Sequence, residues 1–122
     1  MRPYLNRNPS YVFFKLAPEG PYGSDGIALT AGRAIATDKR LFGSGLIGYL
    51  TYPRARFASD GRVEAWEAGS RFVMDQDTGG AIKGPGRADV YWGGGPEAAL
   101  RAGTLNGDAR LWYLLLKETP RP

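Results

Sequence analysis

Carboxylates are the side chains of this sequence best suited to acid–base chemistry. The chain contains no histidine and no cysteine, which excludes Ser-His-Asp and Cys-His catalysis, the usual zinc sites and disulfide bonds. Lys, Tyr, Ser and Thr remain as alternatives. If the chain is an enzyme, its acid and base are expected to be a carboxylate.

The window of residues 74–93 combines such carboxylates with an adaptable backbone. One predicted strand ends near Asp77, a glycine pair follows at Gly79 and Gly80, and a second strand opens with Asp89. Glycine lets the backbone approach a ligand closely, which is typical of a groove floor. The same glycines could instead only shape a turn, and this feature taken alone favours the turn.

The elements that must position these residues are predicted to be short strands. Eighteen glycines and nine prolines punctuate runs of β-branched and aromatic residues, the pattern of an all-β barrel or sandwich. A helix of about two turns is expected from Pro96 to near Gly103. Residues 53–69 predict a hairpin or a long excursion with a turn at Ser59–Arg62. The predicted strands are Tyr11–Leu16, Arg33–Thr37, Leu46–Tyr52, Ser70–Gln76, Ala88–Trp92 and Leu111–Lys117.

The alternation of apolar residues within one of these strands indicates its place in the sheet. Between Arg71 and Gln76 the pattern alternates only partly, which predicts burial on much of both faces and a central rather than an edge position.

Composition sets the outer limits of the interpretation. With 122 residues, 43% of them hydrophobic, the chain fits one compact domain. A net charge of +4 favours polyanions such as nucleic acid, or a cell wall with free carboxylates. The basic residues are scattered, so a merely solvated surface is an equally good interpretation. No apolar run approaches the roughly 18 to 20 residues of a membrane span, and the start has no apolar stretch that could be a signal peptide.

Four sequence blocks, in order, are distributed over most of the chain. They are Asn8–Lys15 (NPSYVFFK), Ala28–Asp38 (ALTAGRAIATD), Gln76–Gly84 (QDTGGAIKG) and Arg87–Gly93 (RADVYWG). Together they resemble the C-terminal three-aspartate domain of the membrane-bound lytic murein transglycosylase A family. Any one block alone would be a weak signal.

That resemblance implies a fold and a reaction. The fold is a six-stranded double-psi β-barrel with one or two short helices, forming a single domain over residues 1–117 with a frayed tail at 118–122. The reaction cleaves the β-1,4 bond between N-acetylmuramic acid and N-acetylglucosamine in peptidoglycan. The sugar's own 6-hydroxyl attacks C1 and closes a 1,6-anhydro ring, so one carboxyl can act first as acid and then as base. No cofactor and no metal are expected.

The family's three aspartates map onto this sequence. The catalytic third aspartate falls on Asp89, and the second and first fall on Asp77 and Asp38, which are expected to orient or tune it. Asp38 could instead form a loop salt bridge beside Lys39 and Arg40, and Asp77 could cap the backbone amides that follow it. The residues expected to bind substrate are Gln76, Thr78, Gly79, Gly80, Ala81, Lys83, Tyr91 and Trp92.

Two of these binding assignments have clear alternatives. Tyr91 and Trp92 could offer aromatic faces to sugar rings, but at least one of two consecutive strand residues is expected to face the core. Lys83 could steer a muramyl or peptide carboxylate, or it could be a solvated loop lysine.

The resemblance also implies partners and a location. The partner is the glycan strand of peptidoglycan in the bacterial cell envelope, in the periplasm or at the outer membrane, and nucleic acid is disfavoured. Family members carry an N-terminal segment with a second domain that forms the opposite wall of the groove, and this chain begins just before the first block. We therefore keep a second hypothesis, an isolated barrel that is a non-catalytic glycan-binding or scaffold module, because positioning drives much of catalysis.

Overall fold

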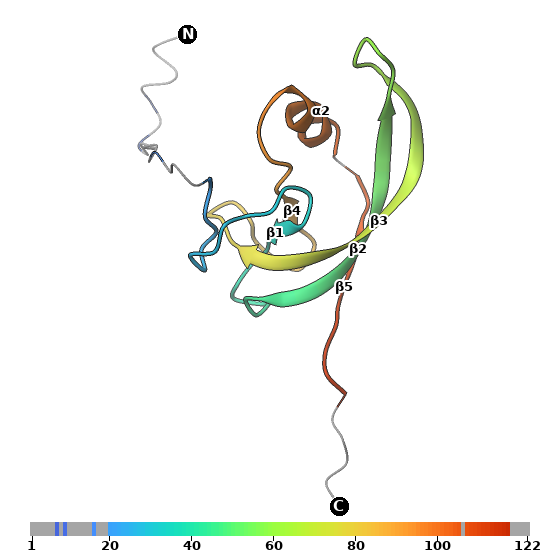
Figure 1. The fold of residues 1–122 in the computed structure, drawn as a ribbon. Helices are drawn as coiled ribbons and strands as arrows, with labels where there is room; N and C mark the ends of the chain where they lie inside the picture. The colour runs from blue at the N-terminus through green and yellow to red at the C-terminus, as the bar shows by residue number, and fades with distance from the viewer. Residues whose placement is uncertain (1–6, 8, 10–15, 17–19, 106, 118–122) are drawn as a thin grey trace, which may run out of the picture.

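The computed structural model describes residues 7, 9, 16, 20–105 and 107–117 (Figure 1). This part of the chain is mostly β, as predicted. The expected strand Tyr11–Leu16 lies outside the described residues except for Leu16, and the expected tail at 118–122 lies outside them entirely. The elements are β1 (Ala34–Ala36), β2 (Leu46–Phe57), β3 (Val63–Asp77), β4 (Asp89–Val90), α2 (Pro96–Thr104) and β5 (Arg110–Tyr113).

All the named strands belong to one five-stranded sheet in the order β4-β1-β3-β2-β5. β1 runs parallel to β3, and the other neighbouring pairs are antiparallel. Figure 1 shows the sheet curling on itself, with the far end of β2 and β3 rising beside α2. The described residues thus form a curled half-barrel, and the sixth strand of the expected barrel is not among them.

β2 and β3 form the hairpin that residues 53–69 predict. The two strands pair continuously, so both run farther than the predicted Leu46–Tyr52 and Ser70–Gln76. The turn lies where it was expected, and the Ala58 amide donates to the Arg62 carbonyl at 2.9 Å.

The other three strands are shorter than predicted. β1 and β4 each lie inside the predicted ranges Arg33–Thr37 and Ala88–Trp92. β5 begins one residue before the predicted Leu111–Lys117 and ends at Tyr113. The apolar residues Leu114, Leu115 and Leu116 that follow it are exposed, so burial does not extend the strand along them.

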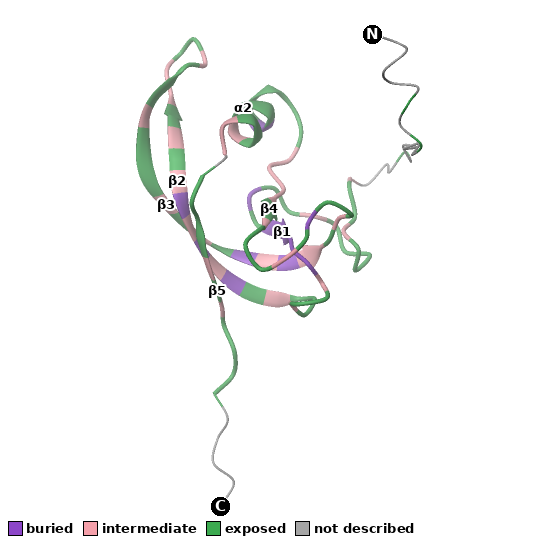
Figure 2. Ribbon diagram, turned by 180° about the vertical axis from the view of Figure 1, so that it is seen from behind, coloured by how far each residue is buried: buried purple, intermediate pink, exposed green. Residues whose placement is uncertain are grey.

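The core lies inside the curl of the sheet. Ile35 of β1, Leu50 and Tyr52 of β2, and Val73 of β3 are buried together. Figure 2 shows buried residues gathered in β1 and in the adjoining parts of β2 and β3, whereas the end of the hairpin is mostly exposed. Partly buried residues that pack against this cluster are Val90, Trp92, Leu105 and Leu111.

β3 has the central position that its pattern predicted, third of the five strands. Its burial nevertheless alternates, because Val73 and Asp75 are buried whereas Phe72 is 56% exposed. The expectation of burial on much of both faces therefore holds only in part, since Met74 on the second face is partly buried and Phe72 is exposed. One face packs on the core, and the other carries Phe72 beside the ring of Tyr49 on β2.

α2 begins at Pro96, as predicted, and ends at Thr104, one residue beyond the predicted Gly103. Glu97 in its first turn accepts from Arg101 one turn later at 2.7 Å, and Ala98 is its buried residue. Among the described residues, no helix combines the length and the apolar character needed to cross a membrane.

Candidate active site

Strand register brings the three predicted aspartates to one end of the sheet. Ala36 of β1 pairs with Asp77 of β3 on one side and with Asp89 of β4 on the other. Asp38 follows Ala36 by two residues. The backbone segments that carry the three side chains are therefore neighbours.

A bulge in β3 separates the two acids at the end of this strand. Ile35 pairs with Asp75, but the next residue of β1, Ala36, pairs with Asp77, which leaves Gln76 as the extra residue. Such an insertion bends the strand and changes the direction of its side chains. Asp75 is completely buried, whereas Asp77 is only partly buried.

Asp38 is buried and ion-paired. Arg40 donates from Nε to Oδ1 at 2.9 Å and from Nη2 to Oδ2 at 2.5 Å, and the Gly84 amide donates to Oδ2 at 2.9 Å. Donors to the ionised form favour that form, so the Arg40 guanidinium, and after it the Gly84 amide, hold the pKa of Asp38 well below its usual range. The salt bridge expected as an alternative for Asp38 is present within the segment after β1. The bond from the Gly84 amide joins that segment to the loop before β4.

Asp77 anchors the loop of residues 21–29 to the sheet. Its Oδ1 accepts from the Ser24 amide at 3.0 Å, and its backbone carbonyl accepts from the Thr37 amide at 3.2 Å. Gly23 lies so close to β3 that a Cβ built on it would be 2.3 Å from the Gln76 carbonyl oxygen. Asp77 thus joins β3 to two other segments of the candidate site.

Asp89 is held in a bidentate ion pair. Arg87 donates from Nε to Oδ1 at 2.9 Å and from Nη2 to Oδ2 at 3.0 Å, and its Nη1 donates to the Ala81 carbonyl at 3.1 Å. The pair raises the pKa of Arg87. The Asp89 side chain is 47% exposed, so it is reachable from solvent, but in this arrangement both of its oxygens are occupied by a cation.

An open cavity of about 790 Å³ lies inside the curl of the sheet, a size typical of ligand sites. Asp89 and Arg87 line it at the β4 edge, and Tyr113 lines it at the β5 edge. Thr37 and the core residue Leu50 also contribute to its wall. Of the side chains predicted to form the site, Asp89 and Trp92 line this cavity.

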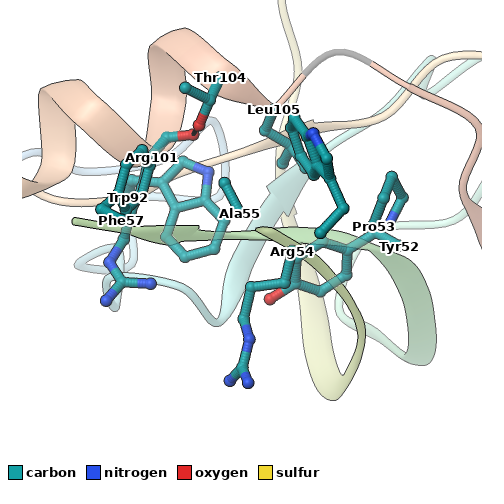
Figure 3. A pocket seen from close by; sticks show the side chains of 10 residues that line it. Tyr52, Pro53, Arg54, Ala55, Phe57, Trp92, Arg101, Thr104 and Leu105 are labelled. Carbon is teal, nitrogen blue, oxygen red and sulfur yellow. Dashed lines mark hydrogen bonds between the residues drawn. The ribbon is translucent and has the colours of Figure 1, made fainter. Parts of the chain in front are cut away.

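Trp92 lies in a stack of rings and guanidinium groups. The Arg71 guanidinium is 4.8 Å from the Trp92 ring centroid and 5.3 Å from that of Tyr52. Figure 3 shows Trp92 and Tyr52 together with Arg101 and Leu105 around a small pocket between the hairpin and α2. That pocket, of about 10 Å³, has room for about one water and not for a sugar ring. Trp92 thus packs with the core, as expected of one of the two adjacent aromatic residues.

The remaining predicted binding residues lie in the loop between β3 and β4 or directly beside it. The Thr78 hydroxyl donates to the Thr37 carbonyl at 2.9 Å, and the backbone of Tyr91 bonds to Gly32 and Ala34. The structure places them beside the aspartates rather than on the cavity wall. In this group Gly80, Ala81 and Lys83 are exposed, and Gln76 and Gly79 are partly buried.

Sequence reasoning missed Asp75. Its carboxylate is 0% exposed and accepts hydrogen bonds from Thr37, Lys39 and Tyr113. Two of these donors are 38 residues away in the sequence, in opposite directions, so no local motif could have indicated the cluster.

Comparison with known proteins identifies the family to which this chain belongs. The family model for the 3D domain matches residues 33–115, a range that contains every described strand and all three predicted aspartates. The chain therefore belongs to the 3D domain family. Its curated relatives are membrane-bound lytic murein transglycosylases A, which confirms the resemblance noted in the sequence.

The relatives match nearly all of this chain, but the chain matches only part of them. The Escherichia coli K12 protein is 34% identical over 117 residues, which cover 93% of this chain and 30% of that protein. The Vibrio cholerae protein is 35% identical over 123 residues, covering 98% and 32%. The chain thus spans about a third of the length of these relatives.

Solved structures show the same fold. Escherichia coli MltA with bound chitohexaose superposes with a TM-score of 0.74 at 32% identity, covering 92% of this chain and 33% of that one. MltA from Neisseria gonorrhoeae also gives a TM-score of 0.74, at 35% identity, covering 97% and 29%.

Proposed function

We propose that this chain is the catalytic domain of a peptidoglycan lytic transglycosylase and that Asp89 is its acid and base. The observation that carries the proposal is the position of Asp89. The residue that matches the family's catalytic aspartate lies on the wall of the 790 Å³ cavity, at the level of Asp77 in the sheet. The names of the relatives, and the chitohexaose bound to one of them, support a glycan as substrate.

The reaction needs one carboxyl group and no activated water. Protonated Asp89 donates its proton to the oxygen of the β-1,4 bond between N-acetylmuramic acid and N-acetylglucosamine, and that bond breaks. The 6-hydroxyl of the muramyl residue attacks C1, its proton passes to the Asp89 carboxylate, and a 1,6-anhydro ring closes. The acid is thereby regenerated. Asp38 and Asp77 orient or tune Asp89: Asp38 accepts from the Gly84 amide in the loop before β4, and Asp77 accepts from the Ser24 amide.

Arg87 sets a condition on this mechanism. A carboxylate that accepts from two guanidinium nitrogens is ionised and cannot donate a proton. The ion pair must therefore open before the acid step, and glycan entering the cavity is the event that we propose opens it. The ionised carboxylate that the acid step leaves, with its oxygens free of Arg87, is the state that accepts the proton of the 6-hydroxyl.

The proposal extends to the parts of the fold beyond the described residues. Residues 1–117 would form one domain, a six-stranded double-psi β-barrel with Tyr11–Leu16 as a strand. A further N-terminal domain would supply the opposite wall of the groove. The setting would be the bacterial cell envelope, with peptidoglycan glycan strands and not nucleic acid as the partner.

The second hypothesis is a glycan-binding or scaffold module without turnover. The openness of the cavity to solvent favours it. Precise positioning of the glycan is a major source of catalytic acceleration. A cavity that is open to solvent would supply less of it.

Digestion of purified sacculi separates the two hypotheses. The chain, Asp89→Asn and Asp60→Asn are incubated with sacculi, and soluble products are identified by mass spectrometry. Asp60→Asn is a matched control, because Asp60 also pairs with an arginine two residues away but lies at the hairpin turn. Anhydromuropeptides from the chain and the control, and none from Asp89→Asn, support the enzyme. Binding to sacculi without products from any variant supports the module.

A further inference from the structure

The carboxylate of Asp75 is the most deeply buried charge among the described residues. A buried charge is costly unless it is paired and hydrogen-bonded. Lys39 Nζ forms a salt bridge with Oδ1, and the hydroxyl groups of Thr37 and Tyr113 each donate to Oδ2 at 2.6 Å. One carboxylate therefore joins β3, the segment after β1, and β5.

This cluster contributes to the cavity wall that faces Asp89. Thr37 and Tyr113 both line the cavity, but Thr37 is only 1% exposed, so Tyr113 is the member that a ligand can reach. Tyr113 lies on one edge strand of the sheet and Asp89 on the other. The ring of Phe42, which also lines the cavity, packs on Tyr113 at 5.3 Å between centroids.

The hydrogen bond to Asp75 fixes what Tyr113 can offer to a ligand. A phenol has one O–H to donate and lone pairs to accept with. Because the O–H of Tyr113 already donates to Asp75, its oxygen can only accept a hydrogen bond from a ligand that reaches it. Burial, and then the bond to Asp75, raise the pKa of Tyr113 to about 12, so the proton stays on the phenol under ordinary conditions.

We propose that Tyr113 is a ligand-binding residue that accepts a hydrogen bond from a hydroxyl or acetamido N–H of the glycan, and that Asp75 is the positioning residue that orients it. The inference rests on the proposed glycan site and specifies which ligand groups it recognises. This part of the cavity wall accepts hydrogen bonds from donors of the ligand. An asparagine at position 75 could donate to the phenol oxygen and so occupy the lone pair that the ligand needs.

Binding of chitohexaose, measured by calorimetry on the full chain, tests the proposal. Tyr113→Phe is expected to weaken binding roughly ten-fold, the worth of one hydrogen bond. Asp75→Asn is expected to weaken it to a similar extent, and the double variant no further, because both changes remove the same contact. Phe42→Leu is the control that alters the adjacent wall but leaves the hydroxyl in place.

A spectroscopic readout separates positioning from mere stability. The phenol of Tyr113, followed by NMR of ¹³Cζ-labelled tyrosine and assigned with Tyr113→Phe, is expected to titrate at lower pH in Asp75→Asn than in the parent. An unchanged titration would overturn the role of Asp75. If Asp75→Asn does not fold, Tyr113→Phe still decides the binding role.

The failures are distinguishable from one another. Equal chitohexaose affinity of the parent and Tyr113→Phe would overturn the inference and leave the proposed function standing. Absence of binding by every variant, the parent included, would refute glycan binding by this chain, and the inference with it.

Discussion

The glycine at position 23 gives a sharp test of how the loop of residues 21–29 supports the site. Gly23 does not need a left-handed conformation, so the effect of Gly23→Ala comes from space alone. The new Cβ would lie 2.3 Å from the Gln76 carbonyl oxygen, against 3.4 Å for an ordinary contact. A backbone atom cannot rotate away as a side chain can, so the loop must move by about 1 Å. Overpacking of this kind lowers the free energy of unfolding by roughly 1 to 3 kcal/mol.

The same displacement has a local consequence at the candidate site. Ser24 follows Gly23 directly and donates to Asp77 at 3.0 Å. A shift of about 1 Å takes that bond beyond ordinary hydrogen-bond length. Asp77 should then lose this partner, and ¹H–¹⁵N NMR should show the Ser24 amide exchanging faster with solvent.

Urea unfolding measures the predicted loss, with Gly80→Ala as the matched control. Gly80 lies beside the same site, but a Cβ there meets nothing within 4 Å, so the change should stay within about 0.5 kcal/mol. Equal free energies of unfolding for the two variants would refute the close approach of the loop to β3.

Three further predictions concern the core and the titrating groups. Ile35→Ala should cost about 2 to 5 kcal/mol of unfolding free energy, and Ile47→Ala far less, since these residues are 1% and 46% exposed; similar losses in urea unfolding would contradict the assigned core. The pKa of Asp38 is lowered by Arg40. The ionised Asp38 carboxylate therefore stabilises the fold above the ordinary aspartate pKa of about 3.9, and this stabilisation is lost as pH falls below that value. Asp38→Asn should make the urea midpoint depend less on pH in the acid range. The pKa of Tyr113 is raised from 10.0 to about 12, so its contribution is present below pH 10 and is lost as pH rises towards 12; Tyr113→Phe should remove that part of the alkaline slope, and an unchanged slope would count against the burial of the phenol.

Sequence patterns predicted the elements whose signals are local. Pro96 and the alanines after it predicted the helix to within one residue of its end. The turn at Ser59–Arg62 predicted the hairpin. The lengths of the strands were not predictable in this way. The predicted strand Leu46–Tyr52 ended before Pro53, yet Pro53 lies inside β2. β5 pairs only with Gly48–Thr51 and leaves β2 an edge strand beyond them, where proline is tolerated.

The sequence predicted which residues belong to the candidate site better than it predicted which contacts they make. The resemblance supplied Asp38, Asp77 and Asp89, and the strand register places their backbones side by side. The partner of Asp89, Arg87, is two residues away and was within reach of inspection. The cluster around Asp75 could not be found by inspection, since its partners come from both sides of β3 in the sheet and only the folded register brings them together.

The bulge at Gln76 explains how two acids separated by one residue in a single strand acquire different roles. In a regular strand that included Gln76, Asp75 and Asp77 would point to the same face of β3, because side chains alternate with a period of two. Both would then compete for one environment, and two carboxylates close together disfavour their shared ionisation. With the bulge, Asp75 points inward to Lys39, Thr37 and Tyr113, whereas Asp77 reaches the Ser24 amide. Deleting Gln76 should remove the bulge but keep the pairings of Ile35 with Asp75 and of Ala36 with Asp77, so the two carboxylates should still point to opposite faces. The hydrogen bond of Tyr113 to Asp75 should therefore survive the deletion, and its loss, seen as a Tyr113 phenol that titrates at lower pH than in the parent, would contradict the assigned bulge.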